Sequence, residues 1–393
     1  MQDFDVTPAE SRADDNAVPV AVVGAGVIGL SVAWRLARLG YAVSVLDPHP
    51  GRGGSWAAGG MLAPVTEAWP GEEAALRLGE ESLRRWPAFA ADLAATGGDP
   101  ELRSEGTLVA AVDQGDIDSL RNLADCLAHL GRAATVLSRH EMREYEPGLD
   151  PVVRGGLLVP GDLAVDNRRL LAALRRACRI AAVRFIGQEV LEVDSGMVRT
   201  TSNTRRYRHV VLAAGAHSCL LHHTLRHAVR PLKGEILRVR ARTTSLPAPE
   251  RTIRAVVEGS RLYLVPRSGG TVVIGATQYE AGFDEAVTVG GTRQLLESAE
   301  RVFPGISEYE LVESSAGLRA SSADNLPIIG RLPDGVIAAT GHHRNGVLLA
   351  PVTADTVADL LRGTEPPDQA RAAYPDRLTG HTDHTDHTDQ EVH

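Results

Sequence analysis

The chain has 393 residues, 43% of them hydrophobic, which is enough to form a sizeable core and two domains. Its net charge of −9 argues against nucleic acid or an anionic membrane surface as a partner, and no run of about 20 apolar residues could span a bilayer. The 3 cysteines are widely scattered and form no C-x-x-C pair, so they indicate neither a disulfide framework nor a metal site.

Both ends of the chain are predicted to be disordered. Residues 1–17 are acidic and polar and lack the basic and apolar regions of a signal peptide, so we interpret them as a leader on a cytoplasmic protein. The other end carries three copies of His-Thr-Asp. Such a tract can bind a metal weakly, but its composition favours a solvated tail, which we place at residues 371–393.

The first predicted elements form the fingerprint of a dinucleotide site. A buried strand over residues 20–23 runs into Gly24, Gly26 and Gly29 and then into an apolar helix. In this pattern Gly24 permits a tight turn, Gly26 lets the backbone approach a pyrophosphate, and Gly29 lets helix and strand pack closely. The N-terminus of the helix also offers free N–H groups and the positive end of its dipole to the phosphates.

A second strand, over residues 42–46, ends in Asp47. The carboxylate of Asp47 can accept hydrogen bonds from both hydroxyls of a ribose, which disfavours a 2′-phosphate. An ordinary glycine-rich turn needs no such combination of strand, helix, second strand and acid. We therefore predict that this segment binds a dinucleotide.

Helices and strands alternate through the first part of the chain, whereas residues 230–315 contain mainly short alternating strands. We predict an α/β protein with a discontinuous Rossmann-like nucleotide-binding domain and an inserted antiparallel-sheet substrate domain. The first comprises residues 18–96, 160–226 and 316–370, and the second comprises residues 97–159 and 227–315. Further helices are expected over residues 72–95, 119–130, 167–181, 291–303 and 347–361, with a short helix or turn over 141–147. Further strands are expected over residues 107–112, 156–159, 183–193, 208–213, 235–239, 255–258, 262–265, 271–274, 310–319 and 336–339.

Three later segments favour FAD over NAD. Residues 55–61 place small side chains and backbone N–H groups soon after the first fingerprint, a buried strand ends in Ala-Ala-Gly with a turn at Gly215, and residues 340–349 form a glycine-bounded loop before a helix. A flavin that stays bound needs close backbone contacts along its length, and a helix N-terminus facing it would stabilise negative charge on its reduced form. Each segment alone fits a routine turn, but together they indicate an FAD-binding domain.

At these residues the chain resembles the FAD-dependent glycine oxidases of thiamine biosynthesis, which belong to the D-amino-acid oxidase and sarcosine oxidase-like superfamily. The resemblance extends from about residue 20 to residue 362 and is most specific in residues 341–351, GHHRNGVLLAP. The other specific stretches are AAGGMLAP at 57–64, PLKGE at 231–235, LYLVPR at 262–267, GAT at 275–277 and GLR at 317–319.

The resemblance implies a set of residues around the FAD. Val27 and Ile28 would lie in the pyrophosphate turn. Asp47 and Pro48 would hold the adenosine ribose, and Val190 would contact adenine through its backbone. The flavin would be lined by Gly54, Ser55, Gly59, Gly60 and Met61 and wrapped at its far end by His342, His343, Arg344, Asn345, Gly346, Val347 and Leu348.

The resemblance also implies a substrate site at Arg319, Tyr263 and Arg344. A guanidinium gives the carboxylate of an amino acid a planar partner with two donors, and Arg319 ends a predicted strand just before the segment that returns to the flavin. Tyr263 would add a hydroxyl to that carboxylate, and Arg344 would complete the site. No residue is assigned as a general base, because flavin amine oxidation needs little acid–base assistance.

The sequence departs from the family at two positions. Gln278 stands where an apolar pocket residue is expected, and Ala320 follows Arg319 where proline is common. Gly317 aligns with the cysteine that carries the flavin covalently in sarcosine oxidases, so we expect non-covalent FAD.

The implied activity is the oxidation of glycine, or of sarcosine or a small D-amino acid, by O2 to an imine and hydrogen peroxide, with hydrolysis of the glycine imine to glyoxylate and ammonia. The imine would supply the thiazole ring of thiamine, with thiazole synthase as a partner, and the family suggests a homo-oligomer. Two alternatives stay open: an FAD-dependent D-amino-acid dehydrogenase that passes electrons to a quinone or another acceptor, and an NAD-dependent enzyme or non-catalytic nucleotide-binding subunit.

Overall fold

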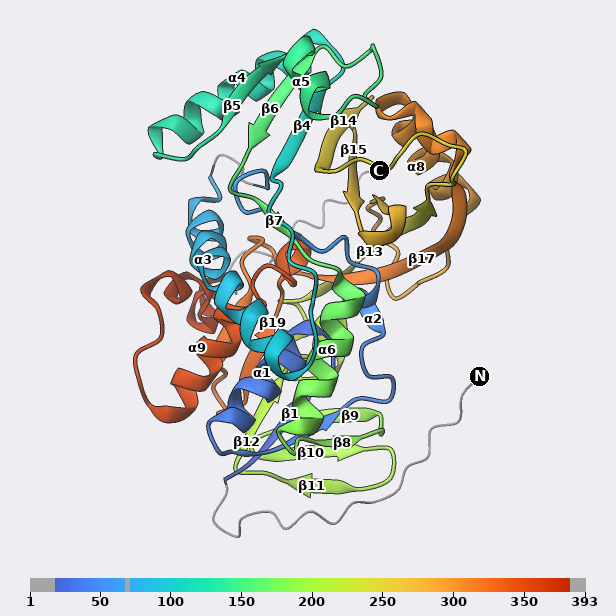
Figure 1. Ribbon diagram of the computed structural model, residues 1–393. Helices are drawn as coiled ribbons and strands as arrows, with labels where there is room; N and C mark the ends of the chain where they lie inside the picture. Colours follow the sequence, from blue (N-terminus) through green and yellow to red (C-terminus); the bar gives the residue numbers. More distant parts are fainter. Residues whose placement is uncertain (1–17, 68–70, 382–393) are drawn as a thin grey trace, which may run out of the picture.

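A computed structural model describes residues 18–67 and 71–381 (Figure 1). The expected leader and residues 382–393 of the expected tail lie outside this range. Two large sheets organise the described residues, one in the lower half of the view and one in the upper half. The predicted α/β fold with a second, mainly antiparallel sheet is confirmed.

The lower sheet has six strands in the order β18-β19-β12-β1-β2-β8, and all neighbours are parallel except β18 and β19. Because side chains alternate along a strand, Val20 and Val22 point to one face while Ala21 and Val23 point to the other. All four are buried, so each face needs a cover. The strands are β1 (Pro19–Val23), β2 (Ala42–Leu46), β8 (Arg184–Ile186), β12 (His209–Leu212), β18 (Ile328–Arg331) and β19 (Ile337–Thr340).

Helices cover the first face of this sheet. They are α1 (Val27–Arg38), α3 (Glu73–Thr96), α6 (Asn167–Ile180) and α9 (Ala350–Arg362). Helix α1 packs against α6 and α9, and α3 packs across both of these (Figure 1). The amphipathic helix expected over residues 72–95 is α3, shifted by one residue. Its apolar side joins the same core as α1, which is buried almost all round.

The other face is covered by a three-stranded antiparallel sheet of β9 (Val190–Asp194), β10 (Met197–Thr200) and β11 (Thr204–Arg206), together with α7 (Ser218–Leu221). The single strand expected over residues 183–193 is therefore wrong. After β8, which belongs to the six-stranded sheet, the chain turns at Gly187, where the Gln188 N–H donates to the Ile186 carbonyl at 2.9 Å. The next strand, β9, then belongs to the three-stranded sheet. Strands β10 and β11 were not predicted, because apolar and polar side chains do not alternate clearly along them.

The upper sheet has eight strands in the order β17-β13-β16-β15-β14-β4-β6-β5, and only β14 and β4 pair in parallel. Helices α4 (Gln114–His129), α5 (Arg139–Tyr145) and α8 (Val289–Val302) pack against it. Its strands come from two separate segments of the chain. They are β4 (Thr107–Ala111), β5 (Thr135–Ser138) and β6 (Gly155–Val159), then β13 (Arg230–Arg240), β14 (Thr252–Val257), β15 (Ser260–Pro266), β16 (Thr271–Gly275) and β17 (Glu310–Ser321).

Strand β17 crosses the boundary that we drew between residues 315 and 316. It continues to Ser321 because it pairs with the whole of β13, down to the pair of Arg230 with Ser321. The helix expected from residue 347 begins only at Ala350, after a 3-10 turn at His343–Asn345. Strand β18 was not expected.

The prediction of a disordered tail from residue 371 is wrong for residues 371–381. Residues 368–381 form two short 3-10 segments, Asp368–Ala373 and Pro375–His381, instead of a disordered chain. Ala373 is buried, and the guanidinium of Arg377 pairs with the carboxylate of Asp324 at 2.6 Å. These contacts attach residues 371–377 to the lower half of the molecule beside β18.

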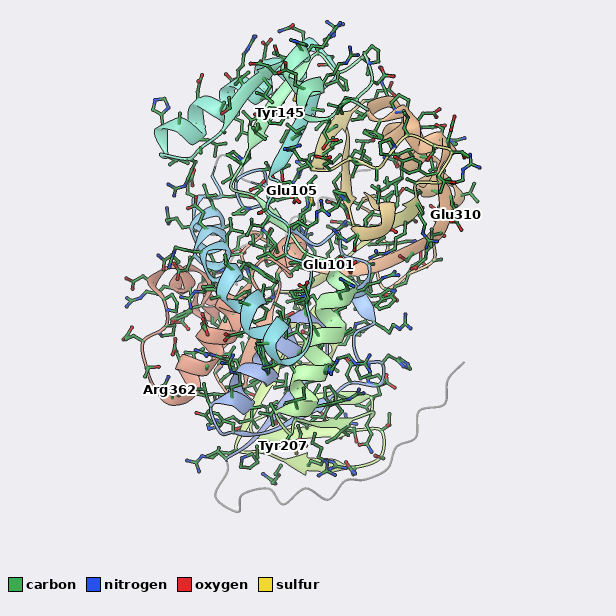
Figure 2. The ribbon with its side chains drawn as sticks, in the orientation of Figure 1. Glu101, Glu105, Tyr145, Tyr207, Glu310 and Arg362 are labelled. Atoms are coloured by element: carbon green, nitrogen blue, oxygen red, sulfur yellow. The ribbon has the colours of Figure 1, made fainter. Side chains whose placement is uncertain are left out.

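Polar contacts and a small sheet connect the two halves. Glu101, labelled near the middle of Figure 2, accepts hydrogen bonds from Arg169 on α6 and from Ser268, which precedes β16. Strands β3 (Met61–Leu62) and β7 (Leu163–Ala164) pair nearby, after the short helix α2 (Gly53–Trp56). Within the described ranges, no helix has the length and apolar character needed to cross a bilayer, and no group of three or more His, Cys, Asp or Glu side chains is placed to hold a metal ion.

Candidate active site

A cleft of about 1060 Å³ runs between the two sheets. At one end it is lined by the residues that follow the carboxyl ends of β1, β2 and β12, including Gly24, Asp47 and Gly215. At the other end it is lined by side chains of β14, β15 and β17. Ligands of open α/β sheets bind at the carboxyl ends of parallel strands, so the position of the first end follows from the fold.

Glycine is required at two positions where the chain passes from β1 into α1. Gly24 has φ of +102° and its N–H donates to the Leu46 carbonyl at 2.9 Å, and a Cβ there would lie 2.4 Å from the carbonyl oxygen of Ala213. A Cβ at Gly29 would lie 1.9 Å from the carbonyl oxygen of Gly24. The first turn of α1 therefore lies directly against the backbone of the loop, as the fingerprint predicts.

Two side chains fix the loops around the N-terminus of α1. One carboxylate oxygen of Asp47 accepts from the Ala25 N–H at 2.7 Å, and the other accepts from the His49 N–H at 2.7 Å. The Ser55 hydroxyl accepts from the Val27 N–H at 3.0 Å. Asp47 is thus held at the end of β2 facing the cleft, where it has further lone pairs for ribose hydroxyls.

The loop that includes α2 is held closely against both sheets. A Cβ at Gly54 would lie 2.4 Å from the Leu318 carbonyl oxygen on β17. Asn167, at the start of α6, donates to the carbonyls of Ser55 and Trp56, at 2.9 Å each, and accepts from Arg238 on β13 at 2.9 Å. The loop backbone is thereby fixed along the wall of the cleft.

Almost every residue that we expected around the cofactor lines the cleft. Gly29 and Leu348 do not. Gly29 instead lets α1 pack against the backbone of Gly24. Leu348 is buried in the core, and its carbonyl accepts from Ser82 at 2.6 Å and from Trp86 at 2.8 Å, so it anchors the loop to α3. The residues that line the cleft are Gly24, Gly26, Val27, Ile28, Asp47, Pro48, Gly54, Ser55, Gly59, Gly60, Met61, Val190, Gly215, His342, His343, Arg344, Asn345, Gly346 and Val347.

The two histidines of the loop before α9 differ in their surroundings. His342 is buried and its Nε2 lies 3.0 Å from the Thr353 hydroxyl, and burial lowers its pKa to about 3. His343 adopts φ of +47°. Burial, followed by the charges of Arg344 and Arg319, lowers its pKa to about 4. Both imidazoles are therefore neutral at neutral pH.

Arg319 and Tyr263 meet at the substrate end of the cleft. Arg319 extends from β17 and donates to the Thr277 carbonyl at 3.2 Å. The ring of Tyr263 lies between two glycines, since a Cβ at Gly59 would be 2.8 Å from Cε2 and a Cβ at Gly275 would be 2.3 Å from the hydroxyl oxygen. Burial lowers the pKa of Arg319 and raises that of Tyr263, and each group opposes the shift of the other.

Arg344 completes this end of the cleft, with a neighbour that sequence reasoning missed. Its Nη2 donates to the Gln278 amide oxygen at 2.7 Å, and its Nη1 lies 3.6 Å from the Glu67 carboxylate. Glu67 also pairs with Arg254 at 2.5 Å. Burial by itself would raise the pKa of Glu67, but Arg254, with Arg344 and Arg261, holds that pKa below its usual value.

The strand register explains why Arg254 and Arg261 belong to the site. Arg254 on β14 stands opposite Tyr263 on β15, and Arg261 precedes Tyr263 by two residues. Opposite residues and residues two apart share a face of a sheet, so all three side chains face the cleft. The alternation around Tyr263 could have identified Arg261, but nothing local in the sequence indicated Glu67 or the opposite strand.

Gly317, which we aligned with the cysteine of sarcosine oxidases, lines the wall of the cleft. A Cβ at Gly317 would lie 2.8 Å from Cβ of Ala57 and 3.2 Å from Cα of Gly54. All three cysteines belong to the described ranges, and none of them lines the cleft. The site therefore offers no thiol to a bound flavin.

Taken together, the cleft can hold a dinucleotide at one end and an anionic small molecule at the other. We compared the chain with known protein families, curated proteins and solved structures. The family model described as "FAD dependent oxidoreductase" matches residues 19–360. The chain is 34% identical over 358 residues to the glycine oxidase of Geobacillus kaustophilus (strain HTA426), a match that covers 88% of this chain and 93% of that protein.

A second relative and a solved structure are also similar to this chain. The chain is 33% identical to the bifunctional protein ThiO/ThiG of Trichormus variabilis (strain ATCC 29413 / PCC 7937), over 87% of this chain but only 52% of that protein. The crystal structure of glycine oxidase from Geobacillus kaustophilus matches with a TM-score of 0.84 and 33% sequence identity, and covers 90% of this chain and 97% of that chain.

Proposed function

Because the chain belongs to the FAD dependent oxidoreductase family, we propose that it is an amino-acid oxidase that acts on glycine in the cleft between its two sheets. FAD is its cofactor. The observation that carries the proposal is the guanidinium of Arg319, which lines the cleft and, among the described residues, donates only to the backbone carbonyls of Lys233 and Thr277. Such a group suits the carboxylate of an amino acid.

The cleft fits FAD along its length. The backbone at Gly24 and the N-terminus of α1 would hold the pyrophosphate, and Asp47 would hold the ribose next to adenine. The loop around Gly54 and the loop around His343 would enclose the flavin. When bound, FAD supplies the redox chemistry: it takes two electrons from the Cα–N unit of the amine and passes them to O2.

The residues of the substrate end bind and orient the amine. Arg319 binds the carboxylate, and the Tyr263 hydroxyl adds a hydrogen bond to it, so the Cα–N unit is held in one orientation. The neutral imidazole of His343 adds no positive charge next to the substrate nitrogen. The ammonium form must lose a proton before oxidation, and the neutral His343 neither favours nor opposes that loss through its charge.

The net reaction for glycine is glycine, O2 and water to glyoxylate, ammonia and hydrogen peroxide. We further propose that the imine formed before hydrolysis supplies the thiazole ring of thiamine, with a thiazole synthase as the partner that consumes it. The sequence resemblance supports this role, and the relative called ThiO/ThiG carries the similar region in a longer, bifunctional chain.

Peroxide release in air from purified, FAD-loaded protein given glycine tests the proposal. We expect peroxide in proportion to glyoxylate, and loss of turnover in Arg319→Ala with FAD retained. The matched control is Arg362→Ala, because Arg362 is exposed and lies away from the cleft, at the lower left of Figure 2. Unchanged glycine turnover in Arg319→Ala would refute the role of Arg319. Turnover with an artificial acceptor but without peroxide would indicate the dehydrogenase instead.

A further inference from the structure

A buried pair of charged side chains lies directly behind the substrate end of the cleft. Gly234 on β13 lines the cleft, so Lys233 and Glu235, one position to either side of it, face the other way, toward α8. Lys233 is the only lysine in the chain, and its side chain is 2% exposed. The side chain of Glu235 is 0% exposed. Neither group touches the substrate in the proposed function.

The carboxylate of Glu235 holds the start of α8. It accepts from the N–H and the hydroxyl of Thr288, at 3.1 Å each, and a Cβ at Gly291 would lie 1.8 Å from it. The N-terminus of a helix favours a negative group, but a carboxylate without access to water also needs a cation. The ammonium of Lys233 lies 3.6 Å from this carboxylate and supplies that cation.

Lys233 also fixes the segment that follows β16. Its ammonium donates to the Asp284 carboxylate at 2.6 Å. This hydrogen bond raises the pKa of Lys233 and lowers that of Asp284, so both groups are charged at neutral pH. The N–H of Lys233 donates to the Tyr279 carbonyl at 2.9 Å, and the Tyr279 N–H donates to the Lys233 carbonyl at 3.0 Å. The main chain and the side chain of Lys233 together hold residues 279–284 against β13.

The same stretch of backbone orients Arg319. Its guanidinium donates to the carbonyl of Lys233 at 3.5 Å and to that of Thr277 at 3.2 Å. Thr277 is bonded in turn to the backbone of Glu235: the Thr277 N–H donates to the Glu235 carbonyl at 3.2 Å, and the Glu235 N–H donates to the Thr277 hydroxyl at 2.9 Å. The backbone that holds Arg319 on the cleft side therefore carries the buried charges on its other side.

We propose that Lys233 is a positioning residue for Arg319, acting from the face of β13 opposite to the substrate. The inference rests on the proposed amino-acid oxidation at this site and adds to it a residue that does not touch the amine. The ammonium, bound to Glu235 and Asp284, keeps β13 and residues 277–284 in the arrangement in which their carbonyls hold the guanidinium. Without it, the buried carboxylate of Glu235 loses its cation, and the backbone around Gly234 shifts to bring that carboxylate toward water. A guanidinium packed against this backbone shifts with it.

Lys233→Met tests the proposal on the FAD-loaded protein, because methionine keeps an unbranched side chain and removes the charge. Acetate is the probe, since it offers a carboxylate but no amine to oxidise, and its binding is followed through the flavin absorbance. We expect Kd for acetate and KM for glycine to rise together, by about tenfold, with a smaller change in kcat, because the contact to the carboxylate is weakened in both cases. Asp284→Asn is the second variant, in case Lys233→Met does not fold. It should raise both constants by about threefold, since Glu235 keeps its cation.

Glu280→Gln is the matched control. Glu280 belongs to the same segment, but its pair with Arg230, at 3.6 Å, is exposed on both sides and contributes little, so both constants should keep their wild-type values. Wild-type constants in the folded, FAD-loaded variants of Lys233 and Asp284, whatever their thermal stability, would overturn this inference and leave the proposed function intact. An equal rise in Glu280→Gln would also overturn it. No peroxide from glycine with the wild type would instead refute the proposed function, while the comparison of acetate binding still decides the role of Lys233.

Discussion

The guanidinium of Arg319 lies against the backbone of Gly234, so closely that a Cβ added to Gly234 would be 2.4 Å from Nη1. The two residues belong to neighbouring strands, in which Gly234 pairs with Gly317 and Leu232 pairs with Arg319. They are diagonal neighbours on one face of the sheet. The missing side chain at Gly234 leaves the space in which Arg319 reaches the Thr277 carbonyl.

Gly234→Ala should displace Arg319 and lower kcat/KM for glycine by about tenfold to a hundredfold, because a misplaced anchor misplaces the reacting atoms. The flavin absorbance of the purified protein should be unchanged. Gly290→Ala is the matched control, since a Cβ at Gly290 on α8 meets nothing within 4 Å. Normal turnover in Gly234→Ala would show that Arg319 is not the carboxylate anchor.

Tyr263→Phe should raise KM for glycine by about threefold to tenfold, the loss of one hydrogen bond, with little change in flavin content. The ring still fills the space between Gly59 and Gly275, so the packing of the site is kept. Steady-state peroxide kinetics check the result against Tyr145→Phe, a tyrosine at the top of the molecule in Figure 2 and outside the cleft. Equal KM values in the two variants would exclude a substrate contact by the Tyr263 hydroxyl.

Denaturation should release all of the flavin into solution. Gly317 provides no attachment atom, and the three cysteines, all within the described ranges, lie outside the lining of the cleft. After acid precipitation, we expect flavin absorbance in the supernatant and none in the pellet. Flavin that stays with the pellet would contradict the prediction of non-covalent FAD and would point to attachment through another residue type.

Asp162→Asn should flatten the pH dependence of stability. Asp162 is buried and accepts from the Thr66 hydroxyl at 2.8 Å, and burial, opposed by Thr66 and Arg254, raises its pKa to about 7. Between pH 4 and pH 7 the folded protein keeps a proton that the unfolded chain has lost. The free energy of unfolding therefore falls as pH rises through this window, by about 4 kcal/mol at most, and becomes constant above it.

Urea unfolding of the wild type and Asp162→Asn at pH 5 and pH 8 measures this effect. The variant should gain stability relative to the wild type on going from pH 5 to pH 8. The comparison between two pH values cancels the constant cost of changing the Thr66 hydrogen bond. The same difference between the two proteins at both pH values would mean that Asp162 titrates normally.

The dinucleotide turn could be predicted from the sequence, because its requirements are local. Gly24 needs a positive φ, Gly29 must lie against the backbone of Gly24, and Asp47 must follow the second strand, and all of these lie within one continuous segment. The FAD cofactor and the family followed from short motifs of the same kind. Arg319, Tyr263 and Arg344 were also found from motifs, and the structure brings them to one cleft.

The rest of the site depends on contacts between segments that are far apart in the sequence. Glu67 and Arg254 are separated by 187 positions and form an ion pair because β14 is placed beside the loop that follows β3. The expected strand over 183–193 divides between two sheets for a similar reason, since pairing partners and not local propensity fix where a strand ends. A sequence pattern indicates which face of a helix or strand is apolar. It does not state which distant element covers that face, and the charges that meet across the cleft depend on that packing.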